Sequence, residues 1–140
     1  MDQLLLERLD GVPDRLASAA RGAPPVAAPG EWSPSDIVRH LIAVELEVWH
    51  VRIAQLATED HPVWAWAEPD RWLGEPGASL ERLLDVYRAA RSRTVALLVA
   101  LDEAGWERTG THETFGVLDI AGLLSRAVDH DEEHLLSLAG

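Results

Sequence analysis

Two histidines near the C-terminal end of the chain have the spacing of a metal-binding pair. His130 and His134 stand four residues apart in the sequence DHDEEHLLSLAG. Four residues of an α-helix rise about 6 Å and turn about 400°, so both imidazoles project from one face. Ala127 and Leu138 lie on the same face, which we therefore expect to be buried. The pair is either half of a metal site or two ordinary histidines near a frayed helix end.

A third histidine lies within an apolar stripe of another segment. His40 occupies the middle of the sequence SDIVRHLIAV. A polar ring among core side chains needs a hydrogen-bonding partner. His40 is either a core histidine bonded to a carbonyl or to a carboxylate such as Glu47, or a third metal ligand that faces His130 and His134 from a neighbouring helix.

The other three histidines are weaker candidates. His50 is ten residues beyond His40, about 15 Å further along a helix and rotated away, so we expect it at the surface. His61 and His112 lie in segments that read as loops. His112 could reach the rim of a site, although a simple loop histidine is the favoured interpretation.

No general base can be identified from the sequence. Glu47 lies two turns after His40 on nearly the same face, and Asp129 and Glu133 are adjacent to the histidine pair. Each could orient a ligand from outside, but a solvated carboxylate is an equal alternative. None of them is assigned a catalytic role.

Four segments with helical periodicity must position these residues. They cover about residues 2–21, 33–57, 79–101 and 117–139. Periodic apolar positions at three- and four-residue spacing indicate amphipathic helices, and no convincing strand alternation is present. The stretch 58–78 has no clean period and contains several prolines and tryptophans, which predicts a long crossover loop.

Local signals refine two of these helices. In WSPSD, Ser33 can cap the second helix, Pro34 can take its first position, and Asp36 completes a pattern like a capping box. In the first helix, Gly11 and Pro13 should bend or split the element.

Together the segments predict an all-α fold, a four-helix bundle formed as a single domain by residues 1–140. The long crossover could let the second and third helices run parallel, in place of a simple up-down-up-down order. Its tryptophans, Trp64, Trp66 and Trp72, either form an apolar lid over a pocket or, as we favour, plug the end of the bundle or an interface. Trp32 and Trp106 should pack at helix ends.

Composition excludes several classes of function. The 140 residues carry a formal net charge of −12 and include no cysteine. Such acidity argues against nucleic acids and anionic membranes as partners. Without cysteine there is no disulfide and no thiolate nucleophile. We find no signal peptide and no membrane span, so we expect a soluble cytoplasmic protein.

The chain resembles the DinB-like family of metal-binding four-helix bundles over nearly its whole length. The similar stretches are WSPSDIVRHLIAVELEVWHVRI, the middle section with EPDRW and SLERLLDVYRAARSRTVALLVAL, and WERTGTHETFGVLDIAGLLSRAVDHDEEHLLSL. The resemblance implies an up-down-down-up bundle and often a homodimer. It also implies a divalent ion held by one histidine of the second helix and two of the fourth, here His40, His130 and His134.

Relatives in the wider superfamily are maleylpyruvate isomerases and S-transferases that use low-molecular-weight thiols. Some of them carry a glutamate where this chain has His130, which makes the isomerase branch a poorer match. Three imidazoles leave an ion such as zinc or nickel, or else iron or manganese, with an open position for water or a small-molecule substrate. The leading hypothesis is a metal-dependent thiol S-transferase or hydrolase. One alternative is a non-catalytic four-helix bundle that binds a metal or ligand in a stress response. The other is a dimeric interaction module.

Overall fold

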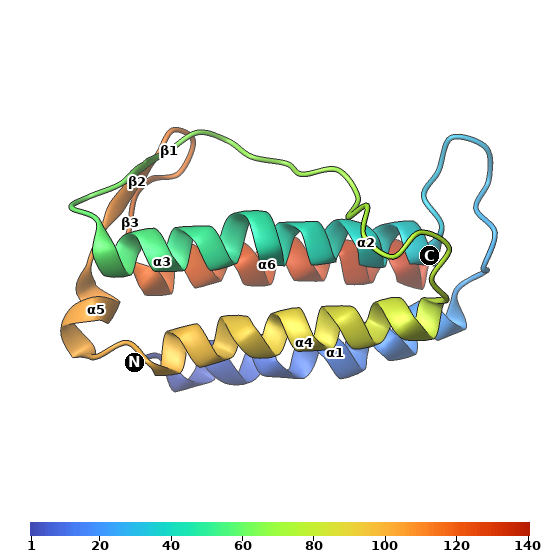
Figure 1. Cartoon of the computed structure of the whole chain (residues 1–140), viewed down its shortest axis with the longest axis horizontal. Helices are drawn as coiled ribbons and strands as arrows, with labels where there is room; N and C mark the ends of the chain where they lie inside the picture. Colours follow the sequence, from blue (N-terminus) through green and yellow to red (C-terminus); the bar gives the residue numbers. More distant parts are fainter.

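Four long helical segments dominate the computed structural model, which covers residues 1–140 (Figure 1). They are α1 (Gln3–Gly22), the continuous run α2 (Pro34–Val44), η1 (Glu45–Trp49) and α3 (His50–Thr58), then α4 (Leu80–Val99) and α6 (Ile120–Ala139). The predicted four-helix bundle is confirmed, and the four helices fall close to the expected ranges. None of them has both the length and the apolar character that crossing a bilayer requires.

The direction of each helix can be followed in Figure 1. Helices α1 and α6 run toward the end of the bundle where the C-terminus lies, whereas α2–α3 and α4 run the opposite way. Helix α1 packs against both α4 and α6, and α2 packs against α4. The segment between α3 and α4 returns along the length of the bundle and lets these two helices run parallel.

The core has two apolar clusters with a polar layer between them. The cluster nearer the start of α1 includes Leu9, Leu56, Leu98 and Leu124. The other includes Leu16, Leu41, Tyr87 and Leu135. On η1, α4 and α6, buried polar side chains occupy the positions between these two sets: Glu45, Arg91, Thr94 and Asp131.

Helix α1 is not split at its proline. Of the two expectations for this helix, a bend or a split, the split is therefore wrong. The helix continues through Gly11 and Pro13, and Pro13 is buried. Proline has no N–H to donate to the carbonyl four residues earlier. That carbonyl, Leu9 O, instead accepts a hydrogen bond from Arg91 Nη1 at 2.9 Å. A side chain from α4 therefore satisfies the acceptor that the proline leaves free.

The second helix begins as its sequence predicts. Ser33 accepts a hydrogen bond from the Asp36 backbone N–H, and the Asp36 carboxylate accepts one from the Ser33 backbone N–H. Further along, η1 is a π-helical stretch, a form that often occurs at functional sites. It begins at Glu45, whose side chain is buried.

A small sheet that the sequence analysis did not predict lies at one end of the bundle. Its strands are β1 (Val63–Trp64), β2 (Gly110–His112) and β3 (Gly116–Leu118), in the order β1-β2-β3, with a short helix α5 (Glu103–Glu107) before β2. Strands of two or three residues are too short to show alternation. β1 pairs parallel with β2, which ties the crossover segment to the connector before α6.

Candidate metal centre

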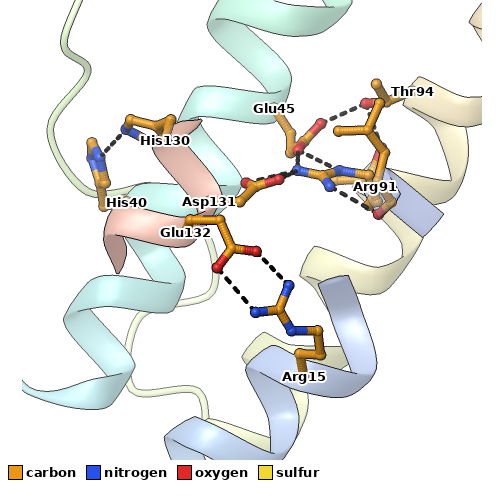
Figure 2. A network of polar contacts seen from close by, with 10 residues as sticks. Arg15, His40, Glu45, Arg91, Thr94, His130, Asp131 and Glu132 are labelled. Carbon is orange, nitrogen blue, oxygen red and sulfur yellow. Dashed lines mark hydrogen bonds and ion pairs between the residues drawn. The ribbon is translucent and has the colours of Figure 1, made fainter. Parts of the chain in front are cut away.

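Three histidines predicted as ligands lie together in the structure. His40 comes from α2, and His130 and His134 come from α6. Together with Glu68 they offer ligand atoms that all lie within 4.8 Å of one another. Nε2 of His40 is 3.3 Å from Nε2 of His130. Figure 2 marks this contact with a dashed line. This group could hold a metal ion.

The donor set fits a divalent ion. Two imidazole nitrogens bound to one tetrahedral zinc at about 2.0–2.1 Å lie roughly 3.3 Å apart. The observed separation of the His40 and His130 Nε2 atoms is 3.3 Å. Imidazole and carboxylate are also ligands that zinc, nickel, iron and manganese accept. The residues therefore match such an ion in both chemistry and spacing.

Backbone contacts of the crossover segment orient the first histidine. Nδ1 of His40 donates to the carbonyl oxygen of Pro69 at 2.8 Å. With the proton of a neutral ring on Nδ1, the lone pair of Nε2 points into the cluster. Metal-binding histidines commonly have this type of outer hydrogen bond. Nδ1 of His130, by contrast, is buried without a partner.

The electrostatics of the cluster favour neutral imidazoles. Burial, together with the neighbouring rings of His130 and His40, lowers the pKa of His134 to about 4. Burial and the proximity of His130 also lower the pKa of His40. Both rings are therefore unprotonated at neutral pH, which is the state that metal ligation requires.

Glu68 is the residue of this cluster that the sequence analysis did not identify. Its Oε1 lies 3.2 Å from His40 Nε2 and 3.6 Å from His130 Nε2. Its side chain is 49% exposed, so it can move. The residue lies in an irregular segment, where no periodicity reports which way a side chain points. The only available signal was its place in the quoted EPDRW stretch, next to Pro69.

The remaining histidines occupy other places. His50 is partly buried and contacts the carbonyl oxygen of Ala90 at 2.9 Å, so the surface position expected for it is wrong. His61 is an exposed loop residue, as expected. Its ring nitrogens contact the hydroxyl groups of two threonines. His112 is not a simple loop histidine, because it lies in β2 and is buried. Glu47 is exposed and makes no hydrogen bond to the cluster.

The tryptophans divide between the two alternatives. Trp64 is buried in the core, where its Nε1 donates to Gln55, and Trp72 packs against the second apolar cluster. Both therefore act as plugs. Trp66 is exposed and lines a cavity beside His130. Trp32 lies 5.2 Å from the ring of His40, measured between ring centroids.

A cavity of about 160 Å³ adjoins the histidine cluster. Glu68 and His130 form part of its wall. The cavity is bounded by α2, η1 and α3, by α6, and by the crossover segment and the β2–β3 turn. A reacting molecule held there would lie against the candidate metal ligands.

A second polar cluster lies on the other side of α6. Arg91 donates from Nε to Glu45 at 2.7 Å and from Nη2 to both oxygens of Asp131 at 3.0 Å. Thr94 also donates to Glu45. All four side chains are at most 2% exposed. Figure 2 shows this cluster beside the histidines, separated from them by the α6 backbone.

Comparison with known proteins defines the class. The family model of the DinB superfamily matches residues 1–138, and the chain belongs to this superfamily. Among solved structures, the chain is similar to YfiT from Bacillus subtilis, described as a probable metal-dependent hydrolase with an unusual four-helix bundle topology. The TM-score is 0.75 at 21% sequence identity, over 96% of this chain and 83% of that one. Among curated proteins, no significant match was found.

Proposed function

We propose that this protein is a divalent-metal-dependent hydrolase whose ion is held by His40, His130 and His134. The observation that carries this proposal is the group of three imidazoles and one carboxylate, with ligand atoms within 4.8 Å of one another, two members of which, Glu68 and His130, line a cavity. The description of the similar protein YfiT as a probable metal-dependent hydrolase supports the same reaction class.

The histidines and Glu68 have separate roles in this proposal. His40, His130 and His134 would hold the ion, and zinc or nickel bound there would lower the pKa of water and polarise a carbonyl or phosphoryl oxygen. His40 is fixed by its hydrogen bond to Pro69, so its Nε2 remains available as a ligand. Glu68 would take a proton from the attacking water and return it to the leaving group as that bond breaks, because its carboxylate lies beside the same nitrogens and is half exposed.

Metal analysis of protein purified without a histidine tag tests the ion itself. We expect about one divalent ion per chain, because three imidazoles form one open site. The same measurement identifies the native metal. Protein that stays metal-free after exposure to zinc, nickel, iron and manganese salts would contradict the proposal.

Two variants then separate metal binding from catalysis. His134→Ala should lose both the metal and the hydrolysis of a panel of esters and amides. Glu68→Gln should keep the metal but lose most of the hydrolysis, about 10²-fold or more for a missing general base. If Glu68→Gln loses metal as fully as His134→Ala does, Glu68 is a fourth ligand and its assigned role is wrong.

Thiol transfer is the competing reaction at the same site. The chain has no cysteine, so any thiol must be supplied as a cosubstrate. With cobalt in the site, a low-molecular-weight thiol that binds the ion should add a charge-transfer band. Suppose that the band appears, that the protein accelerates addition of the thiol to an electrophile, and that it hydrolyses nothing in the panel. The protein would then be an S-transferase and not a hydrolase. If the protein binds metal but catalyses neither reaction, it would be a non-catalytic metal-binding bundle.

We also propose a homodimer. Several large apolar side chains are exposed in the single chain, including Leu73 at 86% and Leu136 at 71%. A second copy packed against such residues would remove them from water. Light scattering at tens of micromolar checks this, and a monomeric mass would contradict it.

A further inference from the structure

The cavity beside the histidine cluster is suited to an apolar molecule. Apart from its charged members, its wall consists largely of Val44, Val48, Trp49, Phe115, Leu118 and Leu123. Its volume is about 160 Å³, and an apolar cavity of about 150 Å³ in another protein accommodates benzene. The space therefore fits the body of a small aromatic or branched aliphatic compound.

One wall residue is a buried cation without a counter-ion. Arg52 of α3 lines the cavity and is 8% exposed. No carboxylate pairs with it; Nη2 donates to the carbonyl oxygen of Ala65 at 2.9 Å, and the guanidinium lies 5.5 Å from the centroid of the Trp64 ring. Burial lowers the pKa of Arg52. A buried charge with so few partners is costly unless another group completes its environment.

The free donors of Arg52 are accessible. A guanidinium has five N–H groups, and only one of its nitrogens makes a hydrogen bond here. Among side-chain polar atoms, those fully enclosed without a partner are Trp49 Nε1, Tyr87 OH and His130 Nδ1. The other nitrogens of Arg52 are not enclosed in this way, so a molecule in the cavity can reach them.

His112 supplies a second donor on the same wall. Its Nδ1 accepts hydrogen bonds from the backbone N–H groups of Thr114 at 3.0 Å and Phe115 at 3.3 Å. The proton of the neutral ring therefore lies on Nε2, which has no partner within the protein. Burial, and then the positive charge of Arg52, lower the pKa of His112. The ring is neutral at pH 7 and offers Nε2–H as a donor.

The other charges on the cavity wall do not neutralise Arg52. Arg126 is paired with Asp129 at 3.1 Å. Glu68 lies against the histidines, and Glu133 is exposed to solvent. The cation left without an anion is therefore Arg52.

We propose that this cavity binds a small organic acid with an apolar body, and that Arg52 and His112 bind its carboxylate. The planar guanidinium matches a carboxylate in shape and charge. The body of the acid fills the apolar part of the cavity, against His130 and Glu68. This inference rests on the proposed function, because it names the class of substrate presented to that metal centre.

The test compares matched acids and amides. Binding of phenylacetate, benzoate and hexanoate and of the corresponding neutral amides is measured by calorimetry on the full chain, both metal-loaded and metal-stripped. We expect each acid to bind at least about tenfold more tightly than its amide, the effect of one charge-assisted pair. Arg52→Gln should bring this ratio close to one, and Arg52→Lys should keep part of it.

Control variants make the outcome decisive. Arg126→Gln removes a cation from the same wall that already has a carboxylate partner, so the ratio should persist. His134→Ala, without metal, should also keep it. A ratio that survives Arg52→Gln, or one that vanishes when the metal is stripped, would overturn the inference, as would failure of every acid to bind. Absence of hydrolysis with an Arg52-dependent ratio would instead refute the proposed reaction alone.

Discussion

Two polar clusters share helix α6 but differ in how they are completed. His130 and Asp131 are consecutive, yet they point to different sides of the helix (Figure 2). Asp131 meets Arg91, and with Glu45 these residues form a group of opposite charges in which every partner belongs to the chain. His130 meets His40, a group of the same kind, and its Nδ1 has no partner at all.

The difference indicates a division of roles. In the Arg91 cluster the protein supplies all the partners, and water is excluded. In the histidine cluster, rings that repel each other when protonated are held close together beside a cavity, and Glu68 is half exposed. The first arrangement connects the helices. The second leaves imidazole and carboxylate lone pairs facing one another, and this group could hold a metal ion.

The largest effect should come from breaking the closed cluster. Arg91→Leu leaves Glu45 and Asp131 buried without a cation, and it also removes the donor to Leu9 O. We expect the free energy of unfolding to fall by about 3–5 kcal/mol, the cost of leaving buried charges unpaired. Urea unfolding measures this.

Arg88 provides the matched control for that substitution. It lies on the same helix and pairs with Asp14, but both side chains are substantially exposed. Arg88→Ala should cost less than about 1 kcal/mol. If the two variants were equally destabilised, the contrast between a closed core cluster and surface pairs would be wrong.

The next effect concerns the histidine cluster and should appear in metal content. His134→Ala and His40→Ala should each lose most of the ion, whereas His50→Ala should retain it because His50 bonds to Ala90 instead. In metal-stripped protein, His134→Ala should change the free energy of unfolding by no more than about 1 kcal/mol. A loss as large as that of Arg91→Leu would show that the histidines serve the core.

A further effect concerns pH. The pKa of His134 is about 4 in the folded protein and about 6.5 when the chain is unfolded. Between these pH values the unfolded chain binds more protons than the folded protein does. The contribution of neutral His134 to the free energy of unfolding is therefore complete above about pH 6.5 and decreases as the pH falls toward 4. Urea unfolding of stripped protein should show this slope. His134→Gln should lack that part of it, and parallel curves for the two proteins would argue against a buried neutral ring.

The sequence alone predicted the four-helix bundle and named three of the candidate metal ligands. Apolar periodicity placed the helices, and the spacing of His130 and His134 placed both rings on one face. His40 was identified because a histidine within an apolar stripe is buried and its polar ring needs a hydrogen-bonding or metal partner. These signals are local to a helix, where the position of one residue fixes the direction of its neighbours.

Features that depend on irregular segments or on pairing across the core were not predictable in the same way. Glu68 reaches the cluster from a loop, and β1 and β2 are too short for a pattern. Arg52 and Arg91 both read as ordinary polar positions of a helix. Whether such an arginine meets carboxylates, as Arg91 does, or only a carbonyl, as Arg52 does, depends on residues far away in the chain.

The smallest effect should come from the residue that follows Asp131. Glu132 forms a two-pronged pair with Arg15 of α1, and both side chains are about half exposed. Solvent screens such a pair, so Glu132→Gln should lower the free energy of unfolding by less than about 1 kcal/mol, with still less effect at 1 M salt. Asp131→Asn, one residue earlier, should cost several times more at either ionic strength, because Arg91 loses a buried anion. Urea unfolding of both variants at low and high salt makes the comparison. Equal losses would mean that burial does not distinguish these neighbouring carboxylates, and the contrast between the inner and outer sides of α6 would fail.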